Sequence, residues 1–237
     1  MKYLLLFDID GTILKFKNYK SKEIFSNMML DIFGVEVPFT AMPDFAGMTD
    51  LQILKEIAHN IGMDDNLIFS KLSDIWERIS EDYNQYCRSE FIDLLPGIEK
   101  LISILSNNRD FALGLQTGNF KANAYSKLVA YNLDSYFPFG AFGCDHENRN
   151  MLPPLAIKRA NEYHKSQLFH QYNTLVIGDS HKDIECAKSN NLPVLAVGTG
   201  NVSAKALEVY NPSAVLDDFS NYNEVIDLIY ELFKKVK

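Results

Sequence analysis

The chain has 237 residues, 47% of them hydrophobic and 23% charged, and this ordinary globular balance excludes a mostly disordered protein. Its formal net charge of −8 argues against nucleic-acid binding as the main activity, because such proteins carry a basic surface. The apolar runs are shorter than a membrane span, and the start MKYLLLFDID lacks the long apolar region of a signal peptide, so we expect no membrane partner. Three distant cysteines favour a reducing, cytoplasmic location: Cys87, Cys144 and Cys186.

Short, continuously apolar runs alternate with amphipathic stretches along most of the chain. Runs that are apolar on both faces are typical of buried parallel strands. They predict strands at residues 3–7, 111–115, 174–177, 193–197 and 214–216. Helical spacing predicts helices at residues 98–106, 121–131, 154–164, 183–189 and 225–233. This alternation predicts an α/β fold with a Rossmann-like, doubly wound parallel sheet.

One region departs from this alternation. Between Lys15 and Leu94 apolar residues recur at helical spacing, in stretches at 24–32, 51–61 and 67–86, with little strand signal. A helical block of roughly eighty residues inserted after the first strand predicts a separate small all-helical domain. We expect this domain to span 16–94 and the α/β core to comprise 1–15 plus 95–237. The joints near 15–18 and 90–94 are the expected hinges.

The first chemical motif is Asp8-Ile9-Asp10-Gly11-Thr12, directly after the first strand. Because strand side chains alternate, Asp8 and Asp10 face the same way, at the carboxyl edge where open α/β sheets bind ligands. Two neighbouring carboxylates repel each other unless a cation lies between them or one is protonated. The pair therefore predicts either a divalent metal site or an acid–base couple. The alternative is that Asp10-Gly11 is only a turn.

A second acidic motif, Gly178-Asp179-Ser180-His181-Lys182-Asp183, follows another apolar run. Asp179 is expected at the strand end and Asp183 in the first turn of the next helix. Carboxylate oxygens are the ligands that a hard cation such as Mg²⁺ prefers. The alternative is that Asp179 or Ser180 only caps the helix.

A third motif, Gln116-Thr117-Gly118-Asn119, follows the strand predicted at 111–115. A hydroxyl group together with free backbone N–H groups at a helix start indicates an anion site. The alternative is a capped turn, which Thr, Gly and Asn also suit.

In combination these motifs resemble the haloacid dehalogenase-like superfamily of hydrolases, most of which are phosphatases. The motifs and the helical insert follow one another in the family's order over nearly the whole chain. The insert resembles the family's helical cap domain of the first type. Two segments resemble the phosphoglycolate phosphatase branch: Gly47-Met48-Thr49-Asp50 and Leu95-Pro96-Gly97.

The resemblance implies a Mg²⁺-dependent phosphatase that acts on a small phosphorylated metabolite such as phosphoglycolate or a sugar phosphate. Asp8 would be the nucleophile that becomes an aspartyl phosphate, and Asp10 the general acid and then the general base. The metal would be held by Asp8, by the backbone carbonyl of Asp10 and by Asp179. Asp183 would support the metal's water shell or bind the metal directly. The phosphoryl oxygens would be held by the third motif: Thr117, Gly118 and Asn119.

The acid at position 10 separates two reactions within this family. Members that break carbon–halogen bonds lack an acid there, because a halide leaves without a proton. Asp10 therefore favours phosphoester hydrolysis over dehalogenation.

One element departs from the family's pattern, which usually supplies a lysine, often as Lys-Pro, before the fourth motif. So many clustered carboxylates need a cation. Arg149 in the segment 147–154 is the expected substitute, because its guanidinium group can pair a phosphate oxygen. Lys158 is the competitor, although it falls within a predicted helix.

Two other functions remain open: a phosphomutase of the β-phosphoglucomutase type, and a non-catalytic binding module on the same scaffold. The chain is expected to be a monomer or a homodimer. Four apolar residues could line the cap side of the substrate pocket or simply pack inside the cap: Phe16, Tyr19, Phe45 and Met48.

Overall fold

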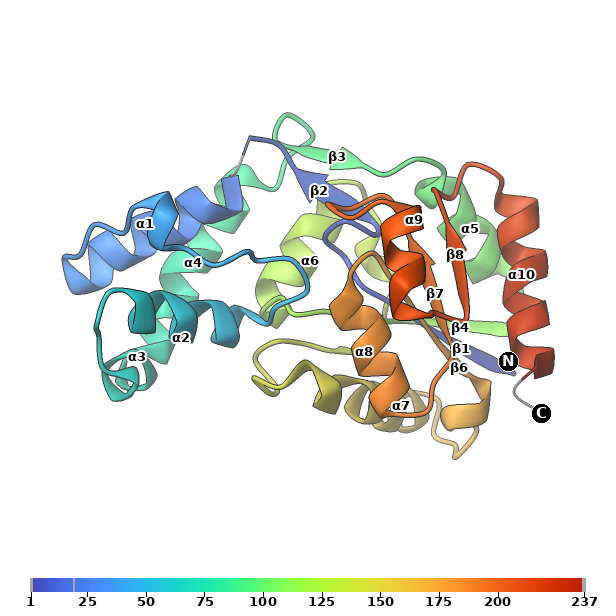
Figure 1. Cartoon of the computed structure of the whole chain (residues 1–237). Helices are drawn as coiled ribbons and strands as arrows, with labels where there is room; N and C mark the ends of the chain where they lie inside the picture. Colours follow the sequence, from blue (N-terminus) through green and yellow to red (C-terminus); the bar gives the residue numbers. More distant parts are fainter. Residues whose placement is uncertain (1, 19, 236–237) are drawn as a thin grey trace.

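The computed structural model describes residues 2–18 and 20–235 of the chain. A six-stranded sheet forms its centre, in the order β5-β4-β1-β6-β7-β8, and every neighbouring pair is parallel (Figure 1). Its strands are β1 (Tyr3–Phe7), β4 (Phe111–Gln116), β5 (Gly140–Ala141), β6 (Thr174–Gly178), β7 (Val194–Val197) and β8 (Ala214–Leu216). Phe7, at the end of β1, pairs in register with Leu115 of β4 and Ile177 of β6. The three segments that follow these strands therefore start at the same edge of the sheet.

Helices cover both faces of this sheet, which confirms the predicted doubly wound α/β class. Leu5 and Phe7 of β1 pack into a buried cluster with α5 (Ile98–Asn107), α6 (Lys121–Val129) and α10 (Tyr222–Lys235). The alternate residues Leu4 and Leu6 pack against α7 (Leu152–Tyr163) on the other face. On that face α8 (His181–Ser189) and α9 (Ala204–Leu207) pack against β6 and β7. The two-residue strand β5 was not predicted, because it is too short to form a hydrophobic run.

Four helices lie together beyond one end of the sheet (Figure 1): α1 (Lys20–Phe33), α2 (Asp50–Asn60), α3 (Asp65–Ser70) and α4 (Leu72–Tyr86). They bury an apolar cluster of their own, whose fully buried members all come from residues 24–83. The single helix expected at 67–86 is instead two helices, because the backbone leaves the helical conformation at Lys71, with φ −115° and ψ 12°. No helix in the described ranges is both long and apolar enough to cross a membrane.

The two segments that connect these helices to the sheet pair with each other. β2 (Leu14–Phe16) and β3 (Ile92–Leu94) form an antiparallel ribbon, with Leu14 opposite Leu94 and Phe16 opposite Ile92. The sequence predicts hinges here but no strands, because three residues are too few to show a period of two. The ribbon brings the outgoing and returning chain side by side and so fixes where the helical block is attached.

Candidate active site

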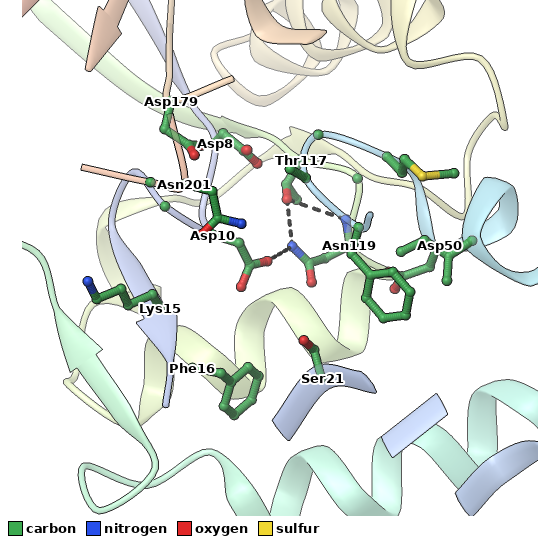
Figure 2. A pocket seen from close by; sticks show the side chains of 18 of the residues that line it. Asp8, Asp10, Lys15, Phe16, Ser21, Asp50, Thr117, Asn119, Asp179 and Asn201 are labelled. Atoms are coloured by element: carbon green, nitrogen blue, oxygen red, sulfur yellow. Dashed lines mark hydrogen bonds between the residues drawn. The ribbon is translucent and has the colours of Figure 1, made fainter. Parts of the chain in front are cut away.

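The carboxyl ends of three neighbouring strands bring the predicted motifs together. Asp8 follows β1, Thr117 follows β4 and Asp179 follows β6, and these strands lie side by side in the sheet. Their side chains line a cavity of about 190 Å³ between the sheet and the helical block (Figure 2). The cavity is also lined by Asp10, Gly118, Asn119 and Arg149. The structure thus gathers the three motifs in one site, as the sequence predicts.

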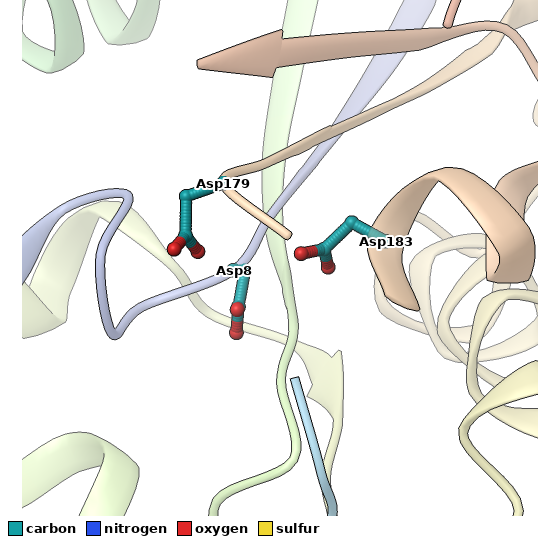
Figure 3. Close-up of side chains that lie close together, drawn as sticks. All are labelled: Asp8, Asp179 and Asp183. Carbon is teal, nitrogen blue, oxygen red and sulfur yellow. The ribbon is translucent and has the colours of Figure 1, made fainter. Parts of the chain in front are cut away.

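Three carboxylates form the acidic end of this site. Ligand oxygens of Asp8, Asp179 and Asp183 lie within 4.8 Å of one another, and all three residues are buried (Figure 3). Burial raises the pKa of Asp8 to about 6, with Arg149 opposing this shift and Asp183 adding to it. Burial also raises the pKa of Asp179 well above its ordinary value, and repulsion from Asp183 and Asp8 adds to this effect. The positive charge around the cluster therefore does not balance the negative charge of its three carboxylates.

Asp183 and Asp179 differ in how many hydrogen bonds their carboxylates accept. One oxygen of Asp183 accepts from the backbone N–H of Ser180 at 3.1 Å and from its hydroxyl group at 2.6 Å. The other oxygen accepts from Arg149 at 2.5 Å. Asp179 accepts a longer hydrogen bond from the hydroxyl group of Thr12, at 3.3 Å. Asp179 is therefore the freer ligand, and Asp183 orients Arg149 and the loop at Ser180.

Arg149 is the cation of this acidic end. It lies at the start of a 3₁₀ turn, is only 4% exposed, and places Nη2 3.1 Å from Oδ2 of Asp8. Its Nη1 donates to the carbonyl oxygen of Gly47 at 3.2 Å, so it also contacts the helical block. The side chain of Lys158 is 69% exposed and lies near Glu162. Of the two cations that the sequence offers, the structure brings Arg149 into the site and leaves Lys158 outside it.

The charge and the chemistry of the acidic end fit a divalent metal ion. Three carboxylates and one guanidinium group have a formal charge of −2, which a divalent cation would neutralise. The three side chains of the cluster offer carboxylate oxygens, which suit a hard ion such as Mg²⁺. The side chain of Asp10 is not part of this cluster, because other groups hold it.

Sequence reasoning missed the residue that holds Asp10. Lys127 of α6 is 2% exposed, and its Nζ donates to Oδ1 and Oδ2 of Asp10, at 2.7 and 2.6 Å. It also donates to Oδ1 of Asn119 at 2.6 Å, and Nδ2 of Asn119 donates to Asp10 at 2.6 Å (Figure 2). One signal could have identified Lys127: it falls on the apolar face of its predicted helix, next to Leu128 and three residues after Ala124.

The third motif contacts the helical block. The hydroxyl oxygen of Thr117 accepts from Nδ2 of Asn119 at 2.8 Å, and the carbonyl oxygen of Gly118 accepts from the backbone N–H of Asp50 at 2.8 Å. A Cβ atom at Gly118 would collide with the carbonyl oxygen of Met48, so this close approach requires glycine. Here the helical block closes against the phosphate-binding motif that the sequence predicts.

Asp50, at the start of α2, adds a second hydrogen bond to this contact. Thr49 caps the helix in a capping box with Gln52, so α2 begins at Asp50. One oxygen of Asp50 accepts from the backbone N–H of Phe120 at 2.7 Å. Burial raises the pKa of Asp50 to about 6, although this hydrogen bond and Lys127 oppose the shift.

A family model described as haloacid dehalogenase-like hydrolase matches residues 5–197. A comparison with curated proteins found no match.

Among solved structures, β-phosphoglucomutase from Clostridium difficile aligns with a TM-score of 0.72 at 18% identity, covering 98% of each chain. A candidate phosphoglycolate phosphatase from Lactobacillus plantarum aligns with a TM-score of 0.66 at 22% identity, covering 96% of this chain and 100% of that one. A hydrolase from Pseudomonas syringae aligns with a TM-score of 0.68 at 19% identity, covering 95% and 98%. Because these sequence identities are low, the structural similarity shows a shared fold and no more.

Proposed function

The chain belongs to the haloacid dehalogenase-like hydrolases, and from this premise we propose that it is a Mg²⁺-dependent phosphatase of small phosphorylated metabolites. One observation carries the proposal. A buried carboxylate, Asp8, lines the cavity and is paired with Arg149 at 3.1 Å, and a second acid, Asp10, lines the same cavity. A nucleophile, a cation for the phosphoryl group and a separate acid are what phosphoester cleavage through an enzyme intermediate needs.

In the proposed reaction Asp8 attacks the phosphorus atom, and the bond from phosphorus to the leaving oxygen breaks. Asp10 gives that oxygen a proton and later takes one from the water that hydrolyses the aspartyl phosphate. Arg149 and the hydroxyl group of Thr117, with the backbone N–H groups of Gly118 and Asn119, would neutralise and orient the phosphoryl oxygens. Lys127 would keep Asp10 at the cavity wall during both steps.

The metal-binding residues are part of the same proposal. Asp8 and Asp179 would be direct ligands, together with the backbone carbonyl of Asp10. Asp183 would act mainly through Arg149 and Ser180, because both its oxygens already accept hydrogen bonds. The ion would supply the positive charge that lets an anionic carboxylate approach an anionic phosphate.

We further propose that residues 16–94 form a cap domain on a core of 1–15 and 95–237. The separate buried cluster of α1–α4 and the β2–β3 ribbon at both junctions support these boundaries. A cap in this position would exclude water during the reaction and open for product release. A cytoplasmic location is supported by the three cysteines, which are free thiols: Cys87, Cys144 and Cys186.

The proposal is tested by phosphate release from 4-nitrophenyl phosphate and a panel of phosphorylated metabolites, with Mg²⁺ and with a chelator. We expect release that requires Mg²⁺ and that disappears in Asp8→Asn. The matched control is Asp227→Asn on the exposed side of α10, which should keep full activity. Full activity with a chelator, or in Asp8→Asn, would contradict the proposal. Isomerisation of a hexose 1-phosphate without free phosphate would instead identify the alternative, a phosphomutase.

A further inference from the structure

The side of the cavity where the leaving group would bind has an apolar wall. Six described residues with large apolar side chains line the cavity: Phe16, Phe25, Phe45, Met48, Ile53 and Tyr83. They include three of the four residues that the sequence suggests for this wall, and Tyr19 lies outside the described residues. The rings of Phe25 and Phe45 pack edge to face at 5.1 Å, and those of Phe16 and Tyr83 at 5.7 Å. These contacts fix the rings in place.

The buried cation on this side has no hydrogen-bond donor left for a substrate. A lysine ammonium group has three N–H donors. Those of Lys127 are used by the two oxygens of Asp10 and by Oδ1 of Asn119. The rings of Phe16 and Tyr83 lie over the same nitrogen, at 5.3 and 5.2 Å. A carboxylate or a second phosphate on the leaving group would find no free N–H group here.

Other charged and polar groups also line the cavity. In the part of the chain that the structure describes, the cavity has two further cationic side chains, Arg149 and Lys15. Arg149 is paired with Asp8 and Asp183, and Lys15 extends from β2 in the direction opposite to Phe16 (Figure 2). Asp50 adds a carboxylate, which repels anions. Ser21 adds a hydroxyl group and Asn201 an amide group (Figure 2).

We propose that the substrate is a phosphomonoester whose leaving group is compact, uncharged and mainly apolar, such as an aliphatic or aromatic alcohol. This inference rests on the proposed phosphatase function and names its substrate class. A polyhydroxylated sugar would lose hydrogen bonds to water against the rings and regain few. An anionic leaving group, as in phosphoglycolate or a hexose bisphosphate, would meet Asp50 and a saturated Lys127. The wall thus favours apolar esters over both kinds of substrate.

The test compares cyclohexylmethyl phosphate with glucose 6-phosphate. Both are primary esters on a six-membered ring, so they differ mainly in hydroxyl groups. We expect kcat/KM to favour the apolar ester on the order of 10–100-fold, as hydrophobic pockets discriminate. Butyl phosphate should likewise be preferred over phosphoglycolate. Equal or reversed preference would overturn the inference.

Two further measurements separate this inference from the function on which it rests. Mg²⁺-dependent release from 4-nitrophenyl phosphate reports the phosphatase activity, whatever the preference among esters. Calorimetric binding of the same esters to Asp8→Asn reports the pocket without turnover. Tighter binding of cyclohexylmethyl phosphate supports the inference even if catalysis fails, and tighter binding of glucose 6-phosphate overturns it.

Variants in α2 offer a matched pair for the same comparison. Ile53 lines the cavity, whereas Ile57, one turn further on, is buried in the cluster of α1–α4 away from it. Ile53→Thr should reduce the preference for the apolar ester several-fold, and Ile57→Thr should leave it unchanged. Equal effects of the two variants would overturn the role of the wall. Selective loss of activity on anionic esters in Lys15→Met would overturn it as well.

Discussion

Lys127 donates hydrogen bonds to both carboxylate oxygens of Asp10, at 2.7 and 2.6 Å, although the two residues lie 117 positions apart in the sequence. The pair joins α6 to the loop after β1 and lies beside the rings of Phe16 and Tyr83. Lys127 therefore holds the proposed acid from α6, and its ammonium group also lies beside two rings of the proposed cap domain.

Lys127→Met is expected to impair proton transfer by Asp10 more than nucleophilic attack by Asp8. Without the ammonium group Asp10 loses its fixed position, so hydrolysis of alkyl phosphates, whose leaving oxygen needs a proton, should fall roughly 100-fold. Hydrolysis of 4-nitrophenyl phosphate should fall much less, because its leaving group departs without a proton. The measurement is kcat for both esters, with Lys121→Met, an exposed lysine of the same helix, as the control. Equal losses on the two esters would show that Lys127 is only structural.

Substitutions of Arg149 and Lys158 are expected to have very different effects on kcat. Arg149→Met removes the cation beside Asp8 and leaves Asp183 buried and unpaired, so kcat should fall at least 100-fold, on the order of other charge-stabilising groups. Lys158→Met removes a charge on the protein surface and should leave kcat and KM unchanged. Steady-state kinetics of both purified variants decide the question. Loss of activity in Lys158→Met, with Arg149→Met active, would reverse the assignment.

Asp50 should make the protein less stable as the pH rises. Its pKa is about 6 in the folded chain and 3.8 as a model value, so the folded state binds more protons between these values. The contribution of Asp50 to the free energy of unfolding therefore falls between about pH 4 and about pH 6. Above that range this contribution stays constant. Asp50→Asn removes the effect and should be more stable than the natural protein at pH 7, by about 3 kcal/mol at most.

Urea denaturation of both proteins at several pH values, with a chelator present, measures this difference. Asparagine keeps an acceptor for the N–H group of Phe120, so the comparison isolates the charge. A difference between the proteins that is the same at pH 4 and pH 7 would contradict the prediction.

Gly118→Ala should hold the cap away from the core, because the new Cβ atom would collide with the carbonyl oxygen of Met48. The single tryptophan of the chain, Trp76 of α4, reports this movement, since its ring stacks on Phe120 of the core at 4.4 Å. We expect a red shift of its fluorescence together with a lower kcat/KM. Phe120→Leu removes the stacked ring without adding bulk, so it should shift the fluorescence while the variant stays active. An unchanged spectrum in Gly118→Ala would contradict the proposed closure.

The sequence was sufficient to predict the parallel sheet, because continuous apolar runs alternate with amphipathic helical stretches, as α/β folds require. The short elements were not predictable: β2, β3 and β5 have three, three and two residues. Pairing across the chain, rather than local composition, makes them strands. The break between α3 and α4 at Lys71 was not predictable either, because the apolar residues keep their helical spacing across it.

For the candidate site, the sequence identified the groups at strand ends but not the lysine of a helix. Asp8 and Asp179 stand out because acids directly follow apolar runs. Lys127 lies on the apolar face of its helix, but this position alone does not indicate its partner, which depends on where α6 packs against the loop of Asp10. The position of Arg149 outside a predicted helix favours it over Lys158, and the structure places Arg149 beside Asp8.

The central claim, that Asp8 carries the phosphoryl group during turnover, is tested most directly by trapping the intermediate. The enzyme is mixed with Mg²⁺ and a substrate whose phosphate group carries an isotopic label, and the reaction is stopped with acid within milliseconds. The peptides of the enzyme are then analysed by mass spectrometry. The account predicts an acid-stable, hydroxylamine-sensitive phosphate on the peptide that contains Asp8, absent in Asp8→Asn. Full turnover with no labelled protein, or with the label on another residue, would contradict it.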